Sequence, residues 1–115
     1  MAGVRAPGFQ DCETAIALPK EAIADFCDRW KIDEFYLFGS VLRSDFRPDS
    51  DIDAMVTFSQ NSSWSLFDLV AMKEELEAVC SRKVDLMTRS SIQDSENWIR
   101  RREILETARL FYVAK

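Results

Sequence analysis

The chain has 115 residues and a net charge of −5, and it contains no histidine. A chain of this length is expected to form one domain around one modest core. The absence of histidine excludes Ser-His-Asp triads, Cys-His dyads, HExxH metalloproteases and Cys/His zinc sites. Any chemistry must therefore come from carboxylates, hydroxyls, arginines or bound metals. The acidic balance also argues against general nucleic-acid binding, because the chain repels phosphate groups.

The short apolar runs and the cysteine usage predict a soluble, cytoplasmic protein. Cys12, Cys27 and Cys80 are odd in number and widely spaced, and no CxxC motif occurs, so free thiols in a reducing compartment are expected. The first ten residues lack the apolar stretch of a signal peptide. No apolar run approaches the ~20 residues that a membrane-spanning helix needs.

The hydrophobic pattern predicts a single domain over residues 19–115, preceded by a loosely held arm over residues 1–18. Apolar side chains at helical spacing indicate helices, and short apolar runs bounded by turn residues indicate strands. Residues 90–96 are polar and are expected to form a loop. This order of elements predicts an α/β fold with a small mixed β-sheet flanked by helices. In chain order, the expected elements are a helix over 19–31, a strand over 34–38, a helical turn over 40–44, a strand over 51–58, a helix over 65–80, a strand over 83–88, a helix over 98–107 and a strand over 109–113.

Three aspartates form the first candidate site. Asp51 and Asp53 are two residues apart on a predicted strand, so their side chains point to the same face. Two such carboxylates repel each other unless a cation lies between them, and Mg²⁺ prefers oxygen ligands of this kind. The plainer interpretation is a chance pair at an exposed strand start. Asp85 can join them if its strand is a neighbour, which would give a two-metal phosphoryl-transfer arrangement; otherwise it is an edge-strand charge that opposes aggregation.

Gly39 and Ser40 form a second candidate, a phosphate-binding turn. Glycine ends a predicted strand and serine opens a helical turn, which together present backbone N–H groups and a hydroxyl to an anion. The pair alone is also an ordinary turn, so its significance depends on its spacing from the aspartates.

That spacing carries a resemblance to a known family. Gly39-Ser40 is followed by ten residues and then by Asp51-Ile52-Asp53, which resembles the GSx10DxD signature of the DNA polymerase β-like nucleotidyltransferase superfamily. Arg43 and the sequence Ser50-Asp51-Ile52-Asp53 make the pattern similar to that of the minimal nucleotidyltransferase (MNT) group. The resemblance runs from about residue 20 to the C-terminus, and Asp85 matches the third carboxylate. It implies the polymerase β-like nucleotidyltransferase fold.

The resemblance implies a role for each of these residues. Gly39 and Ser40 would hold the β- and γ-phosphates of ATP, the nucleotide donor. Asp51 and Asp53 would bind two Mg²⁺ ions. Asp85 would bind the catalytic metal and help to deprotonate the attacking hydroxyl. Arg43 would steady a phosphate or a carboxylate, although a structural ion pair with a nearby aspartate is an equal alternative.

The resemblance also implies a partner. Stand-alone MNT proteins are similar to antitoxins that transfer AMP to a tyrosine of a HEPN-domain RNase toxin and so neutralise it. A chain of this length has no room for an acceptor-binding domain, so a protein acceptor or a second subunit, in a homodimer or hetero-oligomer, is expected. Two alternatives stay open, a non-catalytic antitoxin that acts by sequestration and a small-molecule nucleotidyltransferase that modifies antibiotics.

Several other residues have two interpretations. Asp45 and Asp49 are expected to be solvated loop acids rather than ligands. Arg100, Arg101 and Arg102 would splay over about 200° of a helix, which favours a solvated face, with a docking surface for an acidic partner as the alternative. The tryptophans Trp64 and Trp98 fit either a core or an interface.

Overall fold

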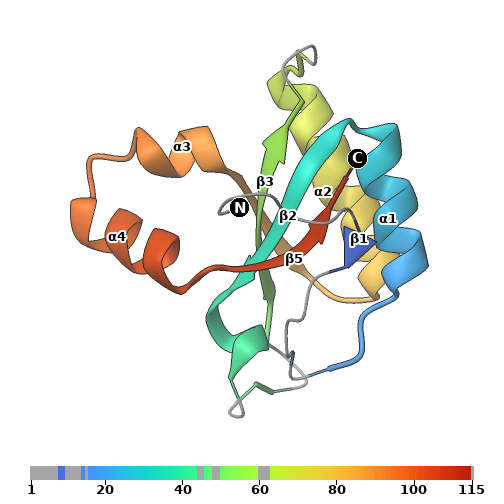
Figure 1. Ribbon diagram of the computed structural model, residues 1–115, viewed down its shortest axis with the longest axis horizontal. Coiled ribbons are helices and arrows are strands. Elements are labelled where there is room, and N and C mark those ends of the chain that lie inside the picture. The colour runs from blue at the N-terminus through green and yellow to red at the C-terminus, as the bar shows by residue number, and fades with distance from the viewer. Residues whose placement is uncertain are drawn as a thin grey trace, which may run out of the picture.

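One five-stranded mixed sheet organises the chain, with strand order β1-β5-β2-β3-β4 (Figure 1). A computed structural model describes residues 8–9, 14, 16–43, 46–47, 50–59 and 63–114. The β3–β4 pair is parallel and the other pairs are antiparallel. The strands are β1 (Gly8–Phe9), β2 (Ile32–Phe38), β3 (Ile52–Phe58), β4 (Val84–Thr88) and β5 (Arg109–Val113). The helices are α1 (Lys20–Arg29), the 3-10 helix η1 (Gly39–Leu42), α2 (Leu66–Cys80), α3 (Arg89–Gln93) and α4 (Trp98–Thr107).

Helices cover both faces of the sheet, because successive strand side chains point to opposite sides. Helices α1 and α2 lie on one face, and α3 and α4 on the other (Figure 1). The α1/α2 face holds the larger apolar cluster, which includes Ile52, Ala54 and Val56 of β3. The α3/α4 face holds a smaller cluster that includes Met55. Because Asp53 alternates with Ala54, it lies on the same face as Met55, which is the α3/α4 face.

Most expected elements are present within one or two residues of their predicted bounds. Helix α4 and strand β5 match the prediction at both ends, whereas β2 begins at Ile32, two residues before its expected start. Helix α2 begins with a capping box between Ser65 and Asp68. Its buried stripe contains Met72 and Leu76, with half-buried side chains on either side, as the helical spacing indicated. The predicted mixed sheet flanked by helices is confirmed.

Two segments differ from the expectation. Gly8 and Phe9, expected in a loose arm, pair with β5, and the Phe9 ring packs against the rings of Phe111 and Tyr112 at centroid distances of 5.6 Å and 5.0 Å. Helix α3 replaces part of the polar loop expected over residues 90–96. The Thr88 side chain caps α3, and its single buried apolar residue is too little to produce a periodic pattern.

The cysteines and one tryptophan have structural roles. Cys27 is buried and Cys80 is half-buried, and both are free thiols; Cys12 lies outside the described residues. Burial raises the pKa of Cys27 to about 12 and that of Cys80 to about 11, so neither is a ready nucleophile. Trp64 packs edge-on against Trp30 and donates a hydrogen bond to its carbonyl oxygen at 3.0 Å. In the described part of the chain, no helix has the length and apolar character needed to cross a membrane.

Candidate functional site

The three predicted aspartates lie together at the beginning of two parallel strands. Asp53 and Asp85 are each the second residue of their strand, and they are direct partners in the β3–β4 register. Asp51 lies immediately before β3, two residues from Asp53 and on the same face. The condition under which Asp85 could join the other two aspartates, that its strand neighbours theirs, is therefore met.

The electrostatic surroundings of Asp53 show that the carboxylates affect one another. Asp53 is half-buried, whereas Asp51 and Asp85 are exposed. Burial and, after it, the negative charges of Asp85 and Asp51 raise the pKa of Asp53, and the positive charges of Arg100 and Arg43 oppose that shift. A cation bound among these carboxylates would relieve their mutual repulsion.

The donor chemistry of this cluster suits a hard divalent cation. All three aspartates offer carboxylate oxygens, which Mg²⁺ prefers. Among the residues that the structure describes, no three acidic or thiol side chains already converge as a metal centre. The strand register thus brings the backbones of Asp53 and Asp85 together, while the side chains do not converge in this structure.

Gly39 lies directly against Asp53. Its φ of +76° is in the left-handed region that favours glycine. The preceding residue, Phe38, is the register partner of Asp53. A Cβ added to Gly39 would overlap the Asp53 carboxylate oxygen Oδ2 and lie 3.2 Å from its Cγ. Glycine therefore allows the turn after β2 to close onto the carboxylate. Gly39 is also the first residue of η1, and the buried Val41 of η1 anchors the turn.

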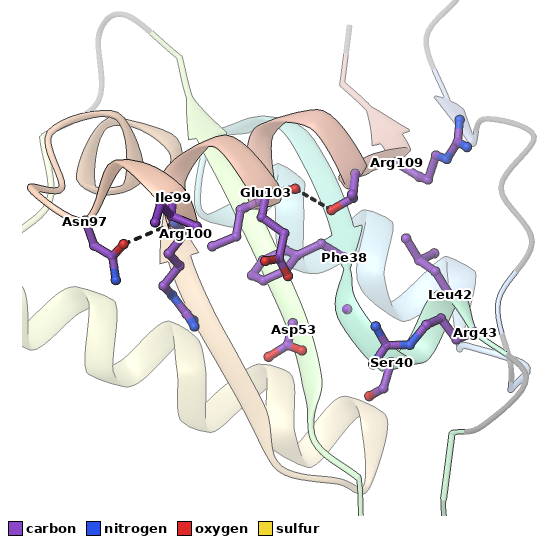
Figure 2. Close-up of a pocket in the computed structure, with 13 residues that line it drawn as sticks. Phe38, Ser40, Leu42, Arg43, Asp53, Asn97, Ile99, Arg100, Glu103 and Arg109 are labelled. Carbon is purple, nitrogen blue, oxygen red and sulfur yellow. Dashed lines mark hydrogen bonds between the residues drawn. The ribbon is translucent and has the colours of Figure 1, made fainter.

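A cavity of about 860 Å³ opens between this turn and helix α4 (Figure 2). This volume is typical of a small-molecule site. One wall comes from the end of β2 and from η1, and Asp53 lies between the walls (Figure 2). Of the predicted site residues, those that line the cavity are Gly39, Ser40, Arg43 and Asp53. Asp51 and Asp85 are not in its lining. Asp45 and Asp49 lie outside the described residues.

The opposite wall is the face of α4 that carries Asn97, Arg100, Glu103 and Thr107. Their spacing of three and four residues places them on one side of the helix. Of the arginine run, for which the sequence favoured a solvated face, Arg100 and Arg102 are exposed and Arg101 is half-buried. Arg100 is exposed but points into the cavity toward Asp53 (Figure 2). The helical spacing was visible in the sequence, but the position of α4 over the glycine turn was not.

Arg82 fixes the segment that leads into Asp51. Its guanidinium donates hydrogen bonds to the carbonyl oxygens of Arg47 at 3.1 Å and Ser50 at 3.0 Å. It also lies over the Phe46 ring, 4.7 Å from the centroid. The neighbouring Ile52 amide donates to the Lys83 carbonyl oxygen at 3.0 Å. The two residues that precede β4 thus hold the residues on both sides of Asp51.

Arg82→Ala is expected to lower the free energy of unfolding by about 1–3 kcal/mol, because it removes charge-assisted hydrogen bonds from two carbonyl groups. Since Asp51 follows Ser50 directly, the same change should weaken the Mg²⁺ binding that the sequence predicts at the aspartates. Chemical denaturation and a Mg²⁺ titration measure the two effects. Lys83→Ala is the matched control, because it removes a neighbouring exposed charge and keeps these contacts. Equal Mg²⁺ affinity in both variants would contradict a role for Arg82 at the aspartates.

Comparison with known proteins shows the family of this chain. The sequence matches the model of the nucleotidyltransferase domain over residues 19–111. Protein adenylyltransferase MntA of Thermococcus cleftensis is 35% identical over 85 residues, which cover 74% of this chain and 81% of the relative.

Two solved structures share the fold. A toxin–antitoxin structure with AMP-PNP has a TM-score of 0.65 at 17% identity and covers 85% of this chain and 76% of the other. A complex of tri-AMPylated Shewanella oneidensis HEPN toxin with MNT antitoxin has a TM-score of 0.54 at 17% identity, covering 78% of this chain and 66% of the other. At these identities, the two structures support the fold alone.

The family match over most of the chain and the mixed sheet together define a nucleotidyltransferase. The chain belongs to the nucleotidyltransferase domain family, and within it to the minimal nucleotidyltransferases. The resemblance seen in the sequence is thereby confirmed, as is the expectation that this chain is an enzyme.

Proposed function

We propose that this chain is a cytoplasmic antitoxin that transfers AMP from ATP to a hydroxyl group, a tyrosine, of a HEPN-domain RNase toxin. The observation that carries the proposal is the Asp53–Asp85 register pair beside the Gly39 turn, because two carboxylates next to a glycine turn suit a site for metal ions and the phosphates that the turn would bind. The kinship with protein adenylyltransferase MntA supports AMP as the transferred group and a protein as the acceptor.

Asp51, Asp53 and Asp85 would hold two Mg²⁺ ions, and their oxygen donors and shared face fit this role. When bound, such ions offset negative charge on the attacking and leaving oxygens. Gly39 and Ser40 would bind the β- and γ-phosphates of ATP at the turn, and Arg43 would steady a phosphate from the same wall of the cavity.

The reaction would be an in-line substitution at the α-phosphorus of ATP. The acceptor oxygen forms a bond to phosphorus, the bond to the bridging oxygen breaks, and pyrophosphate leaves. Asp85 would accept the hydroxyl proton, since its carboxylate is exposed to an incoming acceptor. The turn holds the phosphates against Asp53, so positioning supplies a large part of the rate.

The cavity rim favours a macromolecular acceptor. Ile99 lines the cavity and is 61% exposed, and the adjacent Trp98 is 58% exposed. Exposed apolar side chains beside a cavity suit a protein surface. By analogy with the MNT antitoxin that forms a complex with a tri-AMPylated HEPN toxin, the proposed acceptor protein is a HEPN toxin.

Incubation with α-labelled ATP, Mg²⁺ and the HEPN protein from the neighbouring open reading frame tests the proposal. The expected result is label on the HEPN protein and loss of its RNase activity. An unlabelled partner in the presence of folded enzyme would contradict it. Neutralisation that survives the double change Asp51→Asn and Asp53→Asn would instead indicate sequestration.

A further inference from the structure

The three consecutive arginines of α4 have different surroundings. Arg101 is half-buried and donates hydrogen bonds to the carbonyl oxygens of Gln93 at 3.3 Å and Ser95 at 3.0 Å. Arg102 pairs with Glu106, one helical turn later, at 2.6 Å. For Arg100, within the described part of the chain, the guanidinium makes no hydrogen bond or ion pair, and the backbone amide donates a hydrogen bond to the Asn97 side chain at 3.2 Å. Arg100 is thus the member of the run that is available to a ligand.

The position of Arg100 places its free guanidinium at the cavity. Its side chain extends from α4 into the cavity toward Asp53, and Ser40 lies on the opposite wall (Figure 2). An anion held by the Ser40 turn would therefore face a guanidinium across the cavity. A guanidinium has five N–H donors in a planar fork, which matches the oxygens of a phosphate group.

The alternative to phosphate binding is that Arg100 only balances the charge of Asp53. Arg100 lies near enough to Asp53 to favour its ionised form, so it could serve only to balance the aspartate charge. The geometry does not favour that role, because no ion pair joins Arg100 to a carboxylate among the described residues. Cations bound at the aspartates would also repel the guanidinium and leave an anion as its natural partner.

We propose that Arg100 binds the triphosphate chain of the donor nucleotide from the α4 side of the cavity, opposite Ser40. This inference rests on the proposed function, because it takes ATP as the donor. It makes α4 a second wall of the nucleotide site, in addition to the glycine turn and the aspartates.

Isothermal titration calorimetry of Mg²⁺-ATP and of adenosine tests this role without measuring turnover. Arg100→Ala is expected to weaken ATP binding by about tenfold to a hundredfold, the range for losing a charge-assisted hydrogen bond, and to leave adenosine binding unchanged. Arg100→Lys should fall between the wild type and Arg100→Ala, because lysine keeps the charge and loses the fork. Arg102→Ala is the matched control, because it removes the same charge from the same helix away from the cavity.

Each outcome separates this inference from the proposed function. A wild-type chain that does not bind ATP would overturn both. Normal ATP affinity in Arg100→Ala, or an equal loss in Arg102→Ala, would overturn the role of Arg100 alone. An equal loss of adenosine and ATP binding in Arg100→Ala would also overturn it, because the side chain would then act on the nucleoside. Circular dichroism checks the fold, which the exposed position of Arg100 should preserve.

Discussion

Asp53→Asn is expected to lower the rate of AMP transfer by about three orders of magnitude, or ~4 kcal/mol of transition-state stabilisation, because it removes one carboxylate that the proposed metal ions share. Asp53 is also the aspartate that the glycine turn contacts and that lines the cavity. The amide side chain keeps the shape of the carboxylate and loses its charge, so the substitution tests charge rather than packing. Transfer of label from α-labelled ATP measures the effect.

The same substitution, which lowers activity, is expected to preserve or raise the stability of the fold. Burial and the repulsion from Asp85 raise the pKa of Asp53, so the folded chain binds this proton more tightly than the unfolded chain does. Ionised Asp53 therefore costs stability above its folded pKa, and stability rises as the pH falls through that pKa. Asp53→Asn removes this cost, and its Tm at neutral pH without Mg²⁺ should equal or exceed that of the wild type.

The same variant tests the metal proposal. Mg²⁺ should raise the Tm of the wild type by binding the folded state, and Asp53→Asn should remove most of that increase. Asp28→Asn on α1 is the matched control, because it makes the same chemical change at an exposed position on the other side of the sheet. A variant that retains transfer activity and the Mg²⁺-dependent increase in Tm would show that Asp53 is not a ligand.

The sequence predicts those parts of the site that depend on residues close together in the chain. Alternation along a strand is a local property, so Asp51, Asp53 and Met55 could be assigned to one face without a structure. The spacing from Gly39 to Asp51 is equally local. Whether Asp85 joins the group depends on which strand β4 pairs with, and the sequence could give this only as a condition.

The rest depends on tertiary placement. The parallel β3–β4 pair needs the α2 crossover to return to the same edge, and nothing in the residues around Asp85 specifies it. The α4 wall has a readable polar stripe, yet its position over the cavity comes from the packing of Ile104 and its neighbours in the α3/α4 core, which the sequence does not show. The β1 strand has two residues, which is too short for any periodic signal.

The close contact between Gly39 and Asp53 also depends on the register of β2 and β3. Because of this contact, substitution of Gly39 is expected to reduce transfer activity strongly. Gly39→Ala should lower the free energy of unfolding by about 1–2 kcal/mol, the cost of a left-handed backbone for a residue with a Cβ. The added methyl group would also overlap the Asp53 carboxylate. A short side chain can rotate away from such an overlap, so the steric cost to stability is small, but the carboxylate leaves its place. Transfer activity should fall by about a hundredfold, as expected for a misplacement of ~1 Å at a reacting centre.

Gly8→Ala separates the strain from the displacement. Gly8 also has a positive φ, +104°, but a Cβ there would meet no atom within 4 Å. Gly8→Ala should therefore lose stability through backbone strain and keep its AMP-transfer activity, whereas Gly39→Ala should lose both. Denaturant unfolding and the rate of label transfer, measured on the two variants together, give the comparison. Equal activity in the two would mean that the turn tolerates a side chain and that Asp53 does not depend on Gly39 for its position. Loss of activity in Gly39→Ala alone would show that this glycine keeps the carboxylate where the phosphates and cations of the proposed reaction meet.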